Sequence, residues 1–179
     1  MNNKIFIGGF GGVGSRLLSE IFEKMGLYAG RDKSNDFYDF YGNRFADLFL
    51  ANYHRDKSFK KIFNLIDPVL TTKPNFAVKH GQFMYMFDEL KAHYPNSKNI
   101  YIMRNPVDAA LKTQYIPHLQ YGGHVYDIFD KKVQFYIDES IKAIEKADLT
   151  IKFEDLCFNL ENELVKIKQF LGNPNLASP

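Results

Sequence analysis

Short apolar runs alternate along the chain with longer stretches in which apolar residues recur every three or four positions. The runs have the length and the β-branched or aromatic content of strands that are buried on both faces. We predict such strands over residues 5–7, 76–79, 99–103 and 149–153. The longer stretches predict helices over residues 17–25, 36–53, 58–66 (ending before Pro68), 84–93, 127–146 and 160–171, and a further helix that begins at Pro106.

This alternation predicts a single α/β domain over residues 1–179, with a mainly parallel sheet and helices on both of its faces. In sheets of this kind, ligands bind at the carboxyl ends of the strands. Three candidate groups follow predicted strands, namely a glycine-rich loop after residue 7, the pair Lys79 and His80, and Arg104.

Composition, charge and cysteine count argue against several classes of protein. Hydrophobic residues make up 45% of the chain and charged residues 25%, and a net charge of +2 gives no reason to expect nucleic-acid or membrane binding. The single cysteine, Cys157, excludes an intramolecular disulfide, and the five histidines lack the spacing of a metal site. No apolar run approaches the roughly 18 residues of a membrane span, so we expect a soluble, cytoplasmic protein that requires no metal.

The first candidate site is the sequence GGFGGVGSR, residues 8–16, between the first strand and a helix. Five of its first seven residues are glycines, more than a tight turn needs. Backbone N–H groups at such a loop favour a phosphate or another anion. The pattern leaves the ligand class open: Gly9, Gly11 and Gly14 fit a dinucleotide fingerprint, whereas a kinase P-loop would need a lysine where Ser15 stands.

The second candidate site is the sequence KNIYIMRNPVDAALK, residues 98–112. A buried strand delivers Arg104 to the carboxyl edge of the sheet, and Pro106 suits the first position of the next helix. Arginine makes forked contacts with phosphate, although pairing with a carboxylate such as Asp108 is a common alternative. We therefore expect Arg104 to bind a phosphate.

This second segment resembles the 3′-phosphate-binding segment of sulfotransferases that use 3′-phosphoadenosine 5′-phosphosulfate (PAPS), a strand followed by R-[ND]-P-x-D-x-x-x-S. The glycine loop is similar in position to the family's 5′-phosphosulfate loop. The sequence IKFEDLCFNLENELVKIKQFLG, residues 151–172, resembles the family's strand, Y-E-D-L and F-L-G segment. The resemblance implies a three-layer α/β/α fold like that of P-loop NTPases, and transfer of a sulfuryl group from PAPS to a hydroxyl or amine.

The resemblance also implies roles for individual residues. The 5′-phosphosulfate would be held by Gly11, Gly12, Val13, Gly14, Ser15 and Arg16. Arg104 and Lys112 would hold the 3′-phosphate. Lys79 stands where the family often has a lysine, and His80 is our first choice of catalytic base because it could titrate near neutrality. The acceptor, a small molecule or a glycan, would be bound by loops within residues 32–67 and 114–126.

Three positions depart from the family pattern. Gly12 stands where the family has a cation that stabilises the transferring sulfuryl group, so that Arg16 would have to supply the charge. Lys112 replaces a serine, and Phe153 replaces the tyrosine of Y-E-D-L. Two other functions therefore stay open: a PAPS-binding or nucleotide-binding module without transfer activity, and an NAD(P)-binding oxidoreductase in which Asp32 binds the ribose.

Overall fold

The computed structural model describes residues 3–30, 45, 47–49, 51, 59–112 and 129–172. Within these residues, one parallel sheet has the strand order β2-β1-β3-β4. The strands are β1 (Lys4–Gly8), β2 (Phe76–Lys79), β3 (Ser97–Met103) and β4 (Leu149–Lys152). The predicted parallel α/β fold is confirmed.

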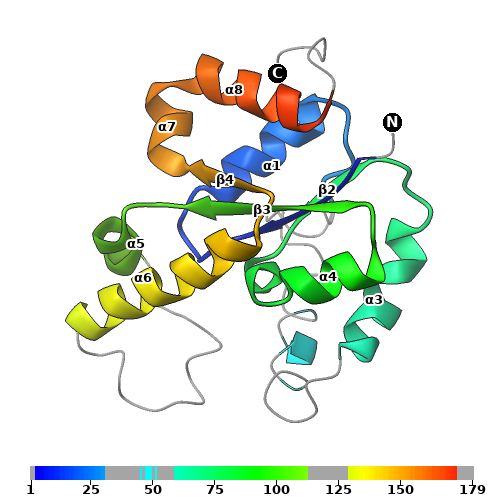
Figure 1. Cartoon of the computed structure of the whole chain (residues 1–179), viewed down its shortest axis with the longest axis horizontal. Helices are drawn as coiled ribbons and strands as arrows, with labels where there is room; N and C mark the ends of the chain where they lie inside the picture. Colours follow the sequence, from blue (N-terminus) through cyan, green and yellow to red (C-terminus); the bar gives the residue numbers. More distant parts are fainter. Residues whose placement is uncertain are drawn as a thin grey trace.

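Helices cover both faces of this sheet. They are α1 (Ser15–Lys24), α3 (Lys60–Leu70), the 3₁₀ helix η1 (Gly81–Tyr85), α4 (Phe87–His93), α5 (Pro106–Lys112), α6 (Phe129–Lys146), α7 (Phe153–Phe158) and α8 (Leu160–Phe170). Figure 1 shows α1 and α8 on one side of the sheet and α4 and α6 on the other. None of the described helices is both long and apolar enough to cross a membrane.

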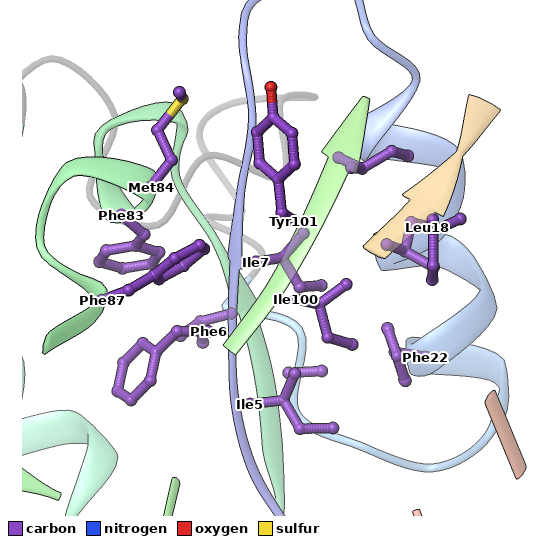
Figure 2. Packing of buried hydrophobic residues seen from close by; sticks show 14 of the residues in the cluster. Ile5, Phe6, Ile7, Leu18, Phe22, Phe83, Met84, Phe87, Ile100 and Tyr101 are labelled. Carbon is purple, nitrogen blue, oxygen red and sulfur yellow. The ribbon is translucent and has the colours of Figure 1, made fainter. Parts of the chain in front are cut away.

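The central strand β1 is buried on both faces, which explains why its sequence is a continuous apolar run. Ile7 and its register partner Ile100 lie on the face toward α1, where Leu18 packs (Figure 2). Phe6 lies on the opposite face and meets Phe83 of η1 edge-on, with 5.3 Å between ring centroids. The core therefore extends on both sides of the sheet and packs around β1.

The strand order indicates that a ligand crevice would lie at the carboxyl ends of β1 and β3. The chain leaves β1 toward β2 on one side, whereas it leaves β3 toward β4 on the other side. Adjacent parallel strands whose connections diverge in this way leave room for a ligand between them. The glycine loop follows β1 and Arg104 follows β3, so both candidate segments lie at this position.

Three elements differ from the sequence prediction. The helix expected to end before Pro68 continues to Leu70, because another turn buries Leu70 in line with Ile66. The last strand ends at Lys152, and Phe153 begins α7, whose first turn carries acidic residues that suit a helix start. The helix expected over residues 84–93 is divided between η1 and α4.

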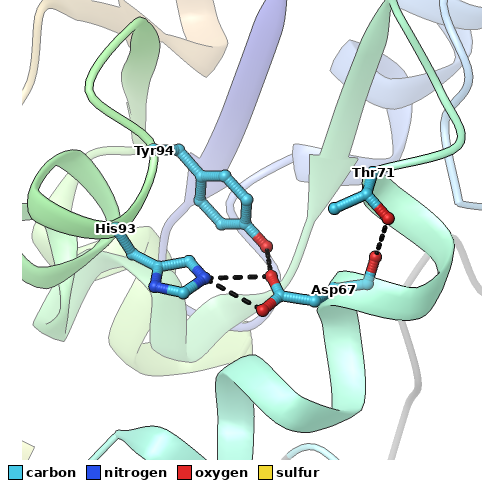
Figure 3. A network of polar contacts seen from close by, with 4 residues as sticks. All are labelled: Asp67, Thr71, His93 and Tyr94. Atoms are coloured by element: carbon cyan, nitrogen blue, oxygen red, sulfur yellow. Dashed lines mark hydrogen bonds and ion pairs between the residues drawn. The ribbon is translucent and has the colours of Figure 1, made fainter.

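A polar network joins α3 to α4 near the amino ends of the strands (Figure 3). Both carboxylate oxygens of Asp67 lie 3.0 Å from Nε2 of His93, and the hydroxyl of Tyr94 donates to the same carboxylate. The ring of Tyr94 also lies beneath the ammonium group of Lys4, at the start of β1. This network is thus at the opposite end of the sheet from the glycine loop.

Candidate functional site

The glycine loop leads from β1 directly into the amino end of α1. Gly14 is the residue before the helix and has φ +84°, a conformation that favours glycine. No side chain caps this helix end, and the first turn of α1 contains no acidic residue. The positive end of the helix dipole and its backbone N–H groups are therefore suited to an anion.

Different physical reasons explain why the individual positions of the loop are glycine. A Cβ on Gly8 would lie 2.5 Å from the backbone nitrogen of Met84, and one on Gly9 would lie 2.6 Å from a backbone oxygen of β3. These two glycines are required by packing alone. Gly11 and Gly12, by contrast, are exposed at the top of the loop, where a ligand could approach the backbone.

Arg104, which we expected from the sequence at the 3′-phosphate, contacts the glycine loop. Its Nη1 donates to the carbonyl oxygen of Gly12 at 3.3 Å, and its Nη2 lies 4.0 Å from a carboxylate oxygen of Asp108. The Arg104 side chain is only 20% exposed, and its Nε is buried without a hydrogen-bond partner. The predicted alternative, pairing with Asp108, is thus present as a loose ion pair and leaves donors of Arg104 for a ligand.

Phe153 and Glu154 lie at the junction of β4 and α7 and contact the segment that carries Arg104. Together with the glycine loop, these residues form one cluster. The guanidinium carbon of Arg104 lies 4.8 Å from the centroid of the Phe153 ring. The same ring covers Gly14, since an added Cβ there would lie 1.9 Å from Cδ2 of Phe153. Oε1 of Glu154 accepts the backbone N–H of Asn105 at 2.9 Å. The sequence prediction gives Phe153 no role in the site, and its place in the F-E-D-L motif is the signal that points to one.

Lys79 and His80 lie at the carboxyl end of β2, the other neighbour of β1 in the sheet. Lys79 is the last residue of that strand and is 9% exposed. His80 is 5% exposed, with its ring 4.4 Å from that of Phe45. Its Nδ1 accepts the backbone N–H of Gln82 at 3.3 Å, which places the proton of the neutral imidazole on Nε2. The base role of His80 stays a prediction.

Four further predicted residues lie in the glycine loop, in the first turn of α1 and at the end of α5. Val13 is buried, Ser15 begins α1, and Arg16 is exposed in the first turn of that helix. Lys112 is the exposed last residue of α5, about 9 Å along the helix axis from its first residue at a rise of about 1.5 Å per residue. Asp32 lies outside the described residues, as do all of the expected loop 114–126 and part of 32–67. No group of three or more metal-ligating side chains occurs within the described part of the chain.

The chain matches the profile of a known protein family. The profile of a family described as the sulfotransferase family matches residues 31–177, and the glycine loop precedes this match. Comparison with curated protein sequences found no significant match.

Several solved structures share the fold at low sequence identity. A sulfotransferase from Alicyclobacillus acidocaldarius is 16% identical, with a TM-score of 0.51 over 100% of this chain and 84% of that one. The sulfotransferase domain from the curacin biosynthetic pathway is 15% identical, with a TM-score of 0.56 over 97% and 75%. Shikimate kinase from Bacteroides thetaiotaomicron is 17% identical, with a TM-score of 0.61 over 95% and 98%. Retinol dehydratase, solved with retinol and PAP, is 16% identical, with a TM-score of 0.50 over 96% and 60%.

Proposed function

Because the chain belongs to the sulfotransferase family, we propose that it transfers a sulfuryl group from PAPS to a hydroxyl or amine of a small-molecule or glycan acceptor. The observation that carries this proposal is the contact between three distant segments. The glycine loop, Arg104 and Phe153 meet at the carboxyl ends of β1 and β3, where a parallel sheet binds its ligand.

The residues at this crevice fit an anionic nucleotide. The amino end of α1 has no side-chain cap and no acidic residue in its first turn, and Gly11 and Gly12 leave the backbone accessible. The buried Nε of Arg104, which has no partner, adds a donor at the same position. Retinol dehydratase, which shares the fold, was solved with PAP, and we propose that the present chain binds the same class of nucleotide.

We propose the following division of roles. The 5′ end of the nucleotide lies on residues 11–16, and the 3′-phosphate lies toward Arg104 and Lys112. PAPS, when bound, supplies the sulfuryl group. Lys79 adds positive charge from β2, and His80 takes up the proton that the acceptor releases.

The hydrogen bond at Nδ1 constrains this role of His80. Uptake of a proton at Nε2 requires the neutral tautomer that carries its proton on Nδ1, and that proton would face the N–H of Gln82. We therefore propose that the Gln82 contact loosens when the acceptor binds. Substitutions of His80, described in the Discussion, test this step.

Calorimetric titration with adenosine 3′,5′-bisphosphate (PAP) tests the binding part of the proposal. We expect saturable binding, and Arg104→Ala should weaken it by about 1.5–3 kcal/mol, the scale of hydrogen bonds to charged groups. Lys24→Ala is the matched control, because Lys24 lies at the opposite end of α1 and its loss should leave the affinity unchanged. Absence of binding at millimolar PAP would refute the proposal.

One observation favours a second candidate, a binding module without transfer activity. The loop residues 8–14 are glycines, Phe10 and Val13, so the loop itself has no cation for the transferring group. Transfer of labelled sulfate from PAPS to a broad panel of phenols, alcohols, amines and glycans separates the two functions. Tight PAP binding without transfer to any acceptor would favour the module.

A further inference from the structure

The glycine loop lacks the charge that its proposed ligand needs. Residues 8–14 contain no ionisable side chain, and the end of a helix contributes only about half a positive charge. The 5′ end of PAPS or PAP carries at least one full negative charge. A cation that balances this charge has to come from outside residues 8–14.

Arg104, which follows β3, is a cation that donates a hydrogen bond to the loop. Its Nη1 donates to the carbonyl oxygen of Gly12, one of the two exposed loop glycines. This contact also covers a backbone oxygen whose partial negative charge would repel an anion. Arg16, which the sequence suggested for this role, is exposed in the first turn of α1.

The ring of Phe153 packs against the guanidinium of Arg104. The same ring contacts the backbone of Gly14, so Phe153 touches both the glycine loop and Arg104. The turn that carries Arg104 is fixed independently, because Glu154 accepts the N–H of Asn105. The aromatic ring is thus the physical link between the loop and the cation.

We propose that Arg104 supplies the positive charge for the 5′ end of the nucleotide, beside the glycine loop, and that Phe153 is the positioning residue that keeps it there. The inference rests on the proposed function and extends the role of Arg104 beyond the 3′-phosphate. A guanidinium has five N–H donors. Of the three nitrogens of Arg104, Nη1 is used by the loop and Nε has no partner, so the group can contact the loop and a ligand together.

Two nucleotides that differ at the 3′ position test the role of Arg104. PAP carries both phosphates, whereas adenosine 5′-phosphosulfate lacks the 3′-phosphate, and its affinity is measured by displacement of a fluorescent PAP analogue. Arg104→Ala should weaken both ligands by about tenfold or more. Lys112→Ala is the matched control and should weaken PAP alone. Arg16→Ala should change the affinity for adenosine 5′-phosphosulfate less than Arg104→Ala does.

Several outcomes would overturn the role of Arg104. Arg104→Ala could weaken PAP and leave adenosine 5′-phosphosulfate unchanged, in which case Arg104 serves the 3′-phosphate only. Wild-type protein could bind PAP while millimolar adenosine 5′-phosphosulfate displaces none of it. This result would show that the positive charge beside the glycine loop is too small to bind the 5′ end of the nucleotide. A wild-type protein that does not bind PAP refutes the proposed function itself, so the two failures are distinguishable.

Substitutions of Phe153 test the positioning role. Phe153→Tyr keeps the ring and should bind both nucleotides within about twofold of wild type, whereas Phe153→Leu should lose about three- to tenfold, the range of a cation–π contact. In the Arg104→Ala background, Phe153→Leu should cause no further loss, because the two residues act together. An equal loss in both backgrounds would show that Phe153 acts only through the fold, and thermal melting confirms that each variant is folded.

Discussion

The ring of Phe153 lies directly on the backbone of Gly14, so closely that a Cβ on Gly14 would come within 1.9 Å of Cδ2 of the ring. Phe153 begins α7 and Gly14 precedes α1, so the contact joins segments 139 positions apart (153 − 14). A side chain at position 14 would force the Phe153 ring to move. The identity of this loop residue is therefore set by the other end of the chain as well as by its own φ.

Gly14→Ala should destabilise the protein by about 2–4 kcal/mol, because a left-handed backbone and a steric overlap are combined. Gly26→Ala is the matched control: Gly26 has φ +85°, and a Cβ there would meet nothing within 4 Å. It should lose only the backbone component, about 1–2 kcal/mol. Chemical denaturation measures both values, and equal losses would show that the Phe153 contact has no energetic weight.

His80→Asn separates the capping role of His80 from its proposed role as a base. His80 precedes η1 and accepts the N–H of Gln82 through Nδ1, and the side-chain oxygen of asparagine can accept the same N–H. We expect PAP affinity close to wild type and a loss of transfer of about 100-fold or more, as for removal of a general base. His80→Ala should lose the cap in addition and melt at a lower temperature. Transfer by His80→Asn at the wild-type rate would assign the base to another residue.

The sequence predicted those parts of the fold that depend on local pattern. The apolar run that ends at Arg104 and the glycine loop after Ile7 are both visible in a few consecutive residues. It did not predict that α3 would continue past Pro68, because that depends on the burial of Leu70 by distant elements.

The candidate site could likewise be predicted only where it depends on neighbouring residues in the sequence. The sequence predicted that the glycine loop and Arg104 lie at the same edge of the sheet, because both follow strands that were expected to be parallel. The part played by Phe153 depends on the register of β4, in which Lys152 pairs with Met103. No local spacing encodes that register, so the contact of Phe153 with Arg104 is available only from the folded structure.

Asp67 should contribute to stability through the network at the amino ends of the strands (Figure 3). Asp67→Ala removes the acceptor of both His93 and Tyr94 and should cost about 1–3 kcal/mol. Combined with Tyr94→Phe, the losses should be less than additive by at least about 0.5 kcal/mol, because the residues share one hydrogen bond. Asp88→Ala is the control, since Asp88 forms an exposed ion pair with Lys146 and should change stability by less than about 0.5 kcal/mol. Strict additivity in urea denaturation would contradict the coupling.

Tyr101 should make the protein sensitive to alkaline pH. Burial raises the pKa of Tyr101 to about 12, although its hydrogen bond with Ser140 opposes the shift. The folded state therefore retains the phenolic proton at pH values where the unfolded chain, with a tyrosine pKa of about 10, has lost it. The resulting stabilisation is complete below pH ~10 and disappears as the pH rises through ~12, a change of about 2–3 kcal/mol for two pKa units.

Tyr101→Phe should therefore be less stable than wild type by about 1 kcal/mol at neutral pH, where it lacks the hydrogen bond to Ser140. Between pH ~10 and ~12 its free energy of unfolding should fall less steeply, so that the two curves converge and then cross. Ser140→Ala keeps the buried phenol and should retain the steep wild-type dependence. The ionisation of lysines is common to all three proteins and cancels in the comparison. Parallel curves for wild type and Tyr101→Phe, measured by urea denaturation across this range, would show that Tyr101 does not govern the alkaline limit.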